Sequence, residues 1–369
     1  MRLEVSQVGH RFDDLAVLEG IELSVEAGEV LALIGPSGCG KSTLLSILGG
    51  LLKPSSGAVF REGDLPEGCL VPMTYVFQDF ALLPWRSVEG NVQLVLEDQP
   101  LTPAERGDRV AEVLGLTGLA DFRAAYPRQL SGGMRQRLGI ARALAVRPAV
   151  LLMDEPLSAL DQARKDEVLP FIERLRDELE VPIVYVSHAM EEIVRLADTL
   201  VLISEGKVVA VGPLEEVTSR LDLRPLTGRY EAGAVLRAKV AGQDLAFGLT
   251  DLAFKGGRLR VPHLKLPLGT ELRVRIRARD VALARTAPVD ASFLNVLPAR
   301  VEEIGSEEGP LRDVKLALGS ETLWARITAR SCHELRLEPA AEVFALIKAV
   351  ALDRHSLGRR SSRGRFLES

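Results

Sequence analysis

Long apolar runs are missing from this sequence of 369 residues. No stretch of eighteen or more apolar residues occurs, so no segment is predicted to cross a membrane as a helix. The first residues, Met1-Arg-Leu-Glu-Val5, begin a strand pattern and lack the apolar core of an export signal. Cysteine is also scarce, and Cys39, Cys69 and Cys332 fit neither a disulfide framework nor metal-ligand spacing. We therefore expect a reduced, cytoplasmic protein.

Charge is unevenly distributed along the chain. Residues 1–220 contain 21 Lys and Arg against 33 Asp and Glu, whereas residues 221–369 contain 25 against 18. One interpretation is two domains with differently solvated surfaces. The other is that the second, basic domain binds an anion. The length of the chain independently favours two domains.

Strand-like and helix-like segments alternate through the first 210 residues, which indicates an α/β fold. Buried strands are predicted at 30–34, 149–153 and 181–186, and each ends in Gly-rich or polar residues, as in a parallel sheet with ligands at its strand tips. Helical spacing predicts one helix at 41–52. It also predicts a helical subdomain at about 88–146, with helices at 106–114 and 134–145.

After about residue 213 the pattern changes to short alternating segments between Gly and Pro turns. The segments 258–261, 271–277 and 341–347 predict a small all-β, barrel-like domain. The predicted division is therefore an α/β domain at 1–220, a β-barrel domain at 221–355, and a basic, disordered tail at 356–369.

A glycine-rich segment, Gly35-Pro-Ser-Gly-Cys-Gly-Lys-Ser42, matches the phosphate-loop pattern G-x-x-x-x-G-K-[ST] in full. Its glycines let backbone N–H groups curl around phosphates, and the helix that follows adds its positive dipole end. We expect Lys41 to reach the β- and γ-phosphates of ATP and the Ser42 hydroxyl to bind Mg²⁺. The predicted nucleotide-binding residues here are Gly35, Pro36, Ser37, Gly38, Cys39, Gly40, Lys41, Ser42 and Thr43.

Two adjacent acids, Asp154 and Glu155, follow the apolar run Leu151-Leu-Met153. Buried carboxylates without partners are unfavourable, so acids at a strand tip suggest chemistry rather than packing. Asp154 fits a residue that holds Mg²⁺ or its waters. Glu155, one residue further out, is placed to orient and deprotonate the attacking water.

The segment Leu130-Ser-Gly-Gly-Met-Arg-Gln136 resembles the signature of ATP-binding cassette (ABC) ATPases, and residues 1–215 resemble ABC transporter ATPases throughout. The resemblance implies a P-loop NTPase fold with a helical subdomain. It implies that Phe12 stacks on adenine and that Asp161 lies in the loop linking two active sites. It also implies that Gln78 senses Mg²⁺ and the membrane partner, and that His188 contacts the γ-phosphate.

Ser131, Gly132 and Gly133 precede a predicted helix, so their hydroxyl and free amides form a second anion site. The phosphate loop already binds one nucleotide, and the second site is therefore expected to face another. In the family that nucleotide belongs to a partner subunit. The resemblance thus implies a two-fold homodimer around two ATP molecules.

The layout of the chain is that of an importer ATPase. No long coiled coil separates Gln78 from Ser131, no second cassette is present, and no membrane helices are fused to the cassette. The resemblance implies a peripheral protein at the cytoplasmic face of the cell membrane, docked on two membrane-spanning permease subunits and served by an extracytoplasmic substrate-binding protein. Docking is expected near Gln78 and Leu82-Leu-Pro-Trp85, where Trp85 is either a contact residue or a core residue.

A soluble ABC ATPase that acts on nucleic acid or ribosomes is the competing class. Its only support is the Arg-rich stretch from Arg354 to Arg365. No nucleic-acid partner is therefore predicted.

Residues from about 270 to 355 resemble the oxyanion-binding Mop-type (TOBE) domain of molybdate importer ATPases, through the segments 274–283, 292–301, 325–328 and 343–350. In such domains Ser292, Asn295 and Lys348 fall at oxyanion-contacting positions. A hydroxyl, amides and a lysine suit a doubly charged tetrahedral anion. The resemblance implies molybdate or tungstate as cargo and as a regulatory effector. A purely structural dimerisation barrel is the alternative.

Two segments of the first domain point elsewhere. Leu82–Val88 and Tyr126–Arg137 resemble nitrate, sulfonate or taurine importers more than typical molybdate importers. The second domain carries more weight because it would hold the anion. The prediction is thus an α/β P-loop ATPase followed by an OB-like barrel, which energises import of molybdate or tungstate. An importer of nitrate, sulfonate, taurine or sulfate remains the alternative.

Overall fold

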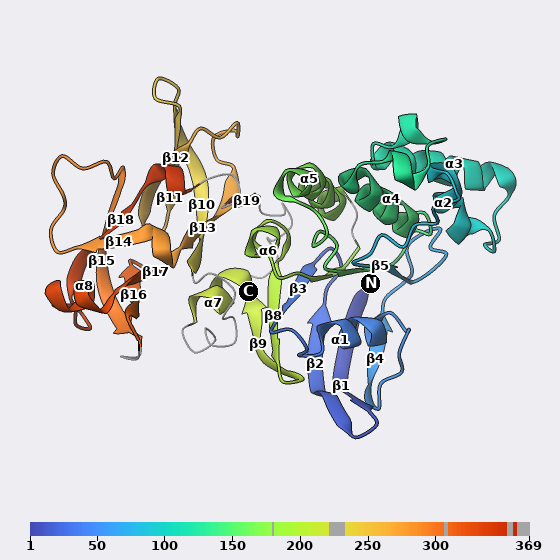
Figure 1. Ribbon diagram of the computed structural model, residues 1–369, viewed down its shortest axis with the longest axis horizontal. Helices are drawn as coiled ribbons and strands as arrows, with labels where there is room; N and C mark the ends of the chain where they lie inside the picture. The colour runs from blue at the N-terminus through green and yellow to red at the C-terminus, as the bar shows by residue number, and fades with distance from the viewer. Residues whose placement is uncertain (179–180, 221–232, 306–308, 353–356, 360–369) are drawn as a thin grey trace. The chain divides into compact units, whose positions relative to one another are not determined.

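The computed structural model describes residues 1–178, 181–220, 233–305, 309–352 and 357–359 (Figure 1). Its contacts divide the chain into two compact units. Unit 1 comprises Met1–His188 and Leu196–Val211, and unit 2 comprises Ala189–Arg195 and Gly212–Ser369. The basic tail predicted at 356–369 lies almost entirely outside the described residues. None of the described helices is both long and apolar enough to cross a membrane.

Unit 1 is built on a six-stranded sheet with the order β5-β6-β7-β3-β8-β9. Strands β5, β6, β7, β3 and β8 run parallel to their neighbours. Every residue of β3 and β7 is buried, because a parallel sheet is covered on both faces. The predicted strands are confirmed, although β7 begins after Pro182 and β6 includes Asp154. The bounds are β3 Val30–Ile34, β5 Met73–Val76, β6 Val150–Asp154, β7 Ile183–Val186, β8 Thr199–Ser204 and β9 Lys207–Pro213.

A second, antiparallel sheet of unit 1 has the order β2-β1-β4, with β1 Arg2–Phe12, β2 Leu15–Val25 and β4 Ser56–Glu62. The helix α1 (Lys41–Leu48) packs into a core shared by both sheets, which includes Leu3, Ile21, Leu33, Leu45 and Val201. It ends four residues earlier than the sequence predicts. Gly49 caps it, and Gly50 takes a left-handed φ of 72° that breaks the helix.

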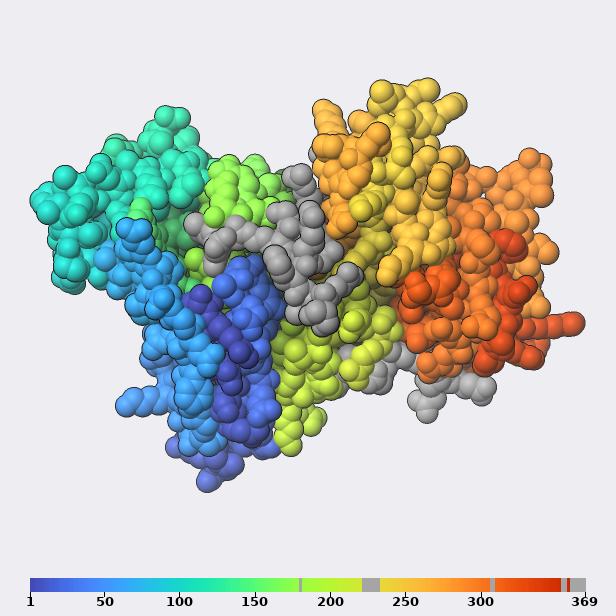
Figure 2. All heavy atoms as spheres, turned by 180° about the vertical axis from the view of Figure 1, so that it is seen from behind, coloured from blue at the N-terminus to red at the C-terminus, as the bar shows by residue number. Residues whose placement is uncertain are grey.

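Helices and their connecting loops form the rest of unit 1, and the residues of its helical segment, teal in Figure 2, gather in one projecting lobe. Thr102 and Glu105 form a capping box at the start of α3, with Pro103 at the first helical position. For this reason α3 starts earlier than the predicted 106–114. The bounds are α2 Val88–Gln93, α3 Pro103–Leu116, α4 Gly132–Leu144 and α5 Gln162–Glu178, with short 3₁₀ turns η1 Leu94–Leu96, η2 Ala120–Phe122 and η3 Pro127–Gln129.

Unit 2 contains two antiparallel five-stranded sheets, with the orders β12-β11-β10-β13-β19 and β14-β18-β15-β16-β17. Both sheets contribute to one apolar core, which includes Leu236, Val274, Val301 and the fully buried Trp324. The predicted all-β, OB-like domain is thus confirmed. The bounds are β10 Gly233–Asp244, β11 Leu249–Phe254, β12 Gly257–Pro262, β13 Glu271–Arg277, β14 Val281–Ala284, β15 Asn295–Ile304, β16 Leu311–Leu318, β17 Glu321–Thr328, β18 Glu342–Ile347 and β19 Leu357–Arg359.

Unit 2 also has short helices. They are α6 Met190–Leu196, which belongs to this unit except for its last residue, α7 Leu214–Ser219 and α8 Ala329–Glu334, with 3₁₀ turns η4 Ala278–Asp280 and η5 Ala349–Ala351. Two arginines of β13 contact two of these helices. Arg273 Nε lies 3.0 Å from Glu215 on α7, and Arg277 lies 3.0 Å from Glu191 on α6. The basic character of the second domain is therefore partly matched by carboxylates of the same unit.

Glu215 shows how strong this matching is. Burial by itself would raise the pKa of its carboxyl group, but the hydrogen bond from Arg237 and the charge of Arg273 outweigh burial and lower the pKa to about 2. Glu215 thus remains ionised at any working pH. The contribution of its ion pairs to the free energy of unfolding is fully present above the ordinary carboxyl pKa and is lost only as the pH falls towards 2.

Candidate active site

Three neighbouring strands bring the predicted catalytic segments to one edge of the sheet. Asp154 at the end of β6 pairs with Val186 at the end of β7, and Val186 pairs in turn with Leu33 near the end of β3. The phosphate loop follows β3, Glu155 follows β6, and Ser187 and His188 follow β7. The prediction that these segments meet at the strand tips is confirmed by this geometry.

The phosphate loop has positions that only glycine can occupy. Gly35 has φ 151°, and a Cβ there would lie 2.0 Å from the carbonyl oxygen of Ile203. Gly40 has φ 102°, and its Cβ would lie 2.6 Å from Leu18 Cδ2. Any larger residue at either position would push the loop away from the sheet. The loop therefore keeps the tight turn that a phosphate cradle needs.

Lys41 begins α1 and is only 6% exposed. Its Nζ donates to the carbonyl oxygens of Gly35 at 2.9 Å and Pro36 at 3.0 Å and lies 3.7 Å from Cys39 Sγ. Gly40 is the N-cap of α1 and makes no side-chain hydrogen bond, so the N-cap residue leaves the first amides of the helix uncapped. An ammonium folded over the loop beside uncapped helix amides is the donor set that a polyphosphate requires. The loop thus fits ATP.

Asp154 has a partner that the sequence did not predict. The Tyr75 hydroxyl, on β5, donates to Asp154 Oδ2 at 3.0 Å. Burial, together with the nearby carboxylate, raises the pKa of Tyr75 above its ordinary value. The phenol therefore stays protonated and acts as a donor. The available signal was an aromatic residue three positions before Gln78, in a segment where the sequence analysis predicted no strand.

Glu155 and His188 contact each other directly. His188 Nε2 pairs with Glu155 Oε1. The backbone of Glu155 has a left-handed φ of 45°, its N–H donates to Val186, and its carbonyl accepts from the N–H and hydroxyl of Ser158. A non-glycine residue held in this region by three hydrogen bonds is typical of a functional position. The sequence placed both side chains at the site but gave no reason to expect them to pair.

The signature segment forms the start of α4. Ser131 is the N-cap, and its hydroxyl accepts from the N–H of Met134 at 3.1 Å. A Cβ at Gly132 would lie 3.1 Å from Leu160 Cδ2, and one at Gly133 would lie 3.2 Å from Glu167 Oε2. Glycine at both positions lets α4 pack closely beside α5. Ser131 itself is exposed and available to a ligand from outside the chain.

Three further predicted residues lie at exposed positions of unit 1. Phe12 ends β1, is 49% exposed, and meets His10 edge to face at 4.6 Å. Gln78 is exposed just after β5. Asp161 accepts from the Arg164 N–H at 3.0 Å and so caps α5. Each could reach a nucleotide or a partner, and their predicted roles in binding stay predictions.

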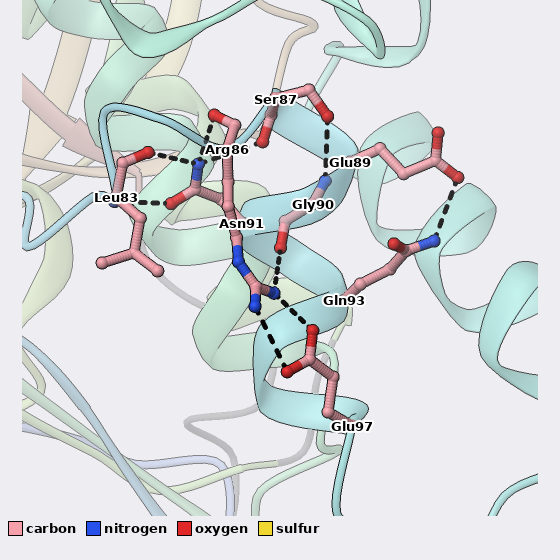
Figure 3. Close-up of polar contacts among 8 residues, drawn as sticks. All are labelled: Leu83, Arg86, Ser87, Glu89, Gly90, Asn91, Gln93 and Glu97. Carbon is pink, nitrogen blue, oxygen red and sulfur yellow. Dashed lines mark hydrogen bonds and ion pairs between the residues drawn. The ribbon is translucent and has the colours of Figure 1, made fainter.

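The loop before α2 is held in shape by a buried side chain. Asn91 on α2 accepts from the N–H of Leu83 at 2.8 Å and donates to the carbonyl oxygens of Leu83, Arg86 and Ser87 at 3.0–3.1 Å (Figure 3). Ser87 caps α2, and Arg86 pairs with Glu97. Trp85, within this loop, is 71% exposed. Of the two interpretations of Trp85, the core residue is thus excluded.

The oxyanion candidates lie at or near one end of the β15–β18 strand pair in unit 2. Asn295 begins β15 opposite Ile347 on β18, Ser292 precedes β15, and Lys348 follows β18. Ser292 and Lys348 are exposed, and Lys348 Nζ lies 6.0 Å from the Phe293 ring centroid. Asn295 is different, because its buried amide is already used.

The Asn295 amide ties β12 to β18. Its Oδ1 accepts from the N–H of Arg260 at 2.6 Å, and its Nδ2 donates to the carbonyl oxygens of Arg260 and Ile347 at 3.0 and 3.3 Å. Both amide donors are therefore satisfied within the domain. A direct contact from this side chain to an anion would break one of these bonds. Asn295 thus supports the shape of the candidate anion site, and a role in contacting the anion stays a prediction.

Together, the phosphate loop, the strand-tip acids, the histidine and the capped signature helix define an ATP-binding cassette ATPase. The family model described as ABC transporter matches residues 18–158, and the TOBE domain model matches residues 291–353. A solved dimeric structure of an ATP-binding cassette protein, in a post-hydrolysis state with ADP and Pi, is 30% identical with a TM-score of 0.50. The match covers 57% of this chain and 98% of the chain in the solved structure. The chain is therefore an ATP-binding, ATP-hydrolysing enzyme of this class.

Relatives that match nearly the whole chain show which family of ABC ATPases it belongs to. The protein named molybdenum import ATP-binding protein ModC from Mesorhizobium japonicum is 45% identical, over 95% of this chain and 96% of that protein. The protein of the same name from Paramagnetospirillum magneticum is 47% identical, over 90% and 94%. The chain belongs to the ModC family of ABC ATP-binding proteins.

Proposed function

We propose that this chain is the ATP-hydrolysing subunit of an ABC importer for molybdate or tungstate. The observation that carries the proposal is the likeness to ModC proteins over nearly the whole chain, which spans both the ATPase unit and the TOBE region. This likeness favours molybdate over the alternative cargoes. The cassette segments that resemble nitrate, sulfonate or taurine importers are embedded in a chain whose full length matches molybdenum importers.

In the proposed site, Lys41 and the amides of Gly38 to Thr43 bind the β- and γ-phosphates. Ser42, Asp154 and Gln78 would hold Mg²⁺, which when bound neutralises charge developing on the phosphates. A hydroxyl and one carboxylate beside the phosphate loop suit this ion, which is usually held by few protein ligands and the nucleotide itself. Glu155 takes the proton of the attacking water.

His188 has two roles in this proposal. Its pairing with Glu155 orients the carboxylate that receives the proton. His188 also follows β7, the neighbour of the strand β3 that leads into the phosphate loop, and this supports a contact of its imidazole with the γ-phosphate. His188 would thus couple the orientation of Glu155, the catalytic base, to the presence of the γ-phosphate.

Two copies would complete each site. Ser131, Gly132, Gly133 and Asp161 of one chain would contact the nucleotide held by the phosphate loop and Phe12 of the other. The support is that Ser131 is exposed while its own chain already supplies a phosphate loop elsewhere, and that the solved relative is a dimer. One loop and one signature in each chain give a two-fold pair.

The partners would be two permease subunits at the cytoplasmic face of the membrane, together with an extracytoplasmic binding protein. The proposed docking surface is the Asn91-held loop from Leu82 to Ser87, with Trp85 at its exposed position. Trp85 is exposed on a loop whose backbone is held by four hydrogen bonds of Asn91. Because little loop entropy would be lost on binding, this tryptophan is pre-organised to fill an apolar pocket of a permease subunit.

Replacing Trp85 with alanine should weaken binding to the permease subunits by at least about tenfold, since a central aromatic anchor contributes roughly 2 kcal/mol or more. The ATP affinity of the separate chain should not change, because Trp85 is exposed and remote in sequence from the phosphate loop. Co-purification with the permease, quantified against wild type, measures the effect. Phe122→Ala, which removes another exposed aromatic of the helical lobe, is the matched control. Equal loss in both variants, or none in Trp85→Ala, would argue against this surface.

In the proposed anion site of unit 2, the exposed Ser292 hydroxyl and Lys348 ammonium would donate hydrogen bonds to a tetrahedral dianion such as molybdate. We propose that cytoplasmic oxyanion binds here as an effector and holds the ATPase inactive. Arg273 and Arg277 of β13 are not needed for this, because they already pair with Glu215 and Glu191.

Calorimetry of the intact chain with molybdate, tungstate, sulfate and nitrate tests the anion site. Molybdate and tungstate should bind at least about tenfold more tightly than nitrate, because the dianions gain an additional charge-assisted hydrogen bond. Lys348→Ala should weaken molybdate binding about tenfold or more, whereas Lys265→Ala should leave it unchanged. If no anion binds the intact chain, both the effector role and the oxyanion site are wrong. The ATPase assignment would stand.

A further inference from the structure

Tyr75 lies beside the proposed metal-binding carboxylate, and the reaction scheme above does not use it. Strands β5 and β6 run parallel, with Tyr75 paired to Leu152. Residues two apart on a strand share a face, so Asp154 lies on the same face of the sheet as Tyr75, one step towards the strand tip. This register brings the phenol hydroxyl to Asp154 Oδ2 at 3.0 Å.

The ring of Tyr75 has little freedom to move. Phe77 stacks on it, with centroids 4.3 Å apart and planes 27° from parallel. At the end of α1, a Cβ added to Gly49 would lie 3.5 Å from Tyr75 Cδ2, in van der Waals contact. The ring is thus packed between the helix that follows the phosphate loop and the residue that precedes Gln78. Its hydroxyl is presented to Asp154 as a fixed donor.

A fixed donor to one carboxylate oxygen restricts rotation of the whole group. Among the described residues, Asp154 Oδ2 accepts this hydrogen bond and Oδ1 accepts none. We propose that Tyr75 is a positioning residue for Asp154, which holds the carboxylate so that Oδ1 is presented to the Mg²⁺ of bound ATP. The inference rests on the proposed role of Asp154 in holding Mg²⁺. Partners that orient a metal-binding group in this way typically change metal affinity by about 10–100-fold.

Packing alone would be a different role, and one substitution separates the two. Phenylalanine keeps the ring, its stack on Phe77 and its contact with α1, but removes the hydroxyl. If Tyr75 only fills space, Tyr75→Phe has no effect on the metal. If it positions Asp154, the effect is confined to Mg²⁺-dependent properties.

The test measures binding of a fluorescent ATP analogue to the intact chain at a series of free Mg²⁺ concentrations and in EDTA. In Tyr75→Phe, the Mg²⁺ concentration that half-maximally strengthens nucleotide binding should rise roughly tenfold. Affinity in EDTA and the thermal midpoint of the nucleotide-free chain should stay at wild-type values. Thr74→Val is the matched control, because Thr74 is the neighbouring residue on β5 and its buried hydroxyl has no hydrogen-bond partner among the described residues. It should leave the Mg²⁺ midpoint close to that of wild type.

A double-mutant comparison identifies the route of the effect. Asp154→Asn should abolish most of the Mg²⁺ enhancement, and adding Tyr75→Phe to it should change nothing further. If Asp154→Asn keeps the enhancement, the proposed role of Asp154 itself is wrong. If Asp154→Asn loses it while Tyr75→Phe keeps the wild-type midpoint, only the positioning role fails. A Tyr75→Phe variant weakened equally in EDTA would show that the residue supports the fold, and this too would overturn the inference.

Discussion

Replacing Glu155 with glutamine is expected to lower ATP turnover by about 100-fold or more while ATP still binds with wild-type affinity. Glutamine has the same shape and Cβ, so the left-handed backbone at φ 45° and its three hydrogen bonds are preserved. What is lost is a group that accepts a proton from water. Lys41 and the loop amides that bind the phosphates are untouched.

Phosphate release and nucleotide titration on the same preparation separate turnover from binding. Glu178→Gln, which neutralises an exposed carboxylate at the end of α5, serves as the control and should hydrolyse ATP normally. A Glu155→Gln chain that turns over at the wild-type rate would remove Glu155 as the base. A chain that no longer binds ATP would instead point to a role in holding the loop.

Replacing Ser131 with arginine should lower turnover by about 100-fold or more, because it removes a donor to the second nucleotide and blocks its approach. Loss of the N-cap of α4 adds a stability loss of about 1 kcal/mol. The unmixed chain should still bind ATP, since its own phosphate loop is intact. The two-chain site makes a sharper prediction when this variant is mixed with Lys41→Ala, which is also inactive by itself.

In a mixed dimer, the intact loop of the Ser131→Arg chain meets the intact signature of the Lys41→Ala chain. One of the two sites is then complete. If half of the dimers are mixed, the mixture should regain roughly a quarter of wild-type activity. Ala104→Arg, at an exposed position in the first turn of α3, tests for a general effect of an added arginine and should leave turnover unchanged. A mixture no more active than its separate components would argue that each site lies within one chain.

The strand-tip site could be predicted from sequence because its parts are contiguous in the chain. Val30–Ile34 followed by Gly35–Ser42 specifies strand, loop and helix, and parallel strands end at a common edge. Contacts between side chains from distant segments were not predictable in this way. The Tyr75–Asp154 bond depends on the register of β5 against β6, and the Glu155–His188 pair depends on a backbone conformation that no local pattern around Glu155 specifies.

Charge pairing and burial were less predictable from sequence. The count of basic residues predicted that the second domain carries net positive charge, but it could not predict which acids pair with its arginines. In the structure, Arg273 and Arg277 pair with Glu215 and Glu191. Trp85 could equally have been a core residue. The structure places it, exposed, on the loop that the Asn91 side chain holds through hydrogen bonds to Leu83 and Arg86, and the pattern around Trp85 does not specify this arrangement.

The chain passes between the two units three times, and the first passage is at the peptide bond that joins His188 to Ala189. Within unit 2, α6 is held closely: Arg277 pairs with Glu191, and a Cβ at Gly358 would lie 2.2 Å from the carbonyl oxygen of Val194. The two halves of the protein are therefore interlaced in sequence rather than consecutive. In evolution or engineering, a C-terminal domain could not be exchanged for that of a relative as a simple cassette after residue 220. The exchanged part would also have to include residues 189–195 of the same relative. One of the new junctions would then fall directly after His188 of the ATPase.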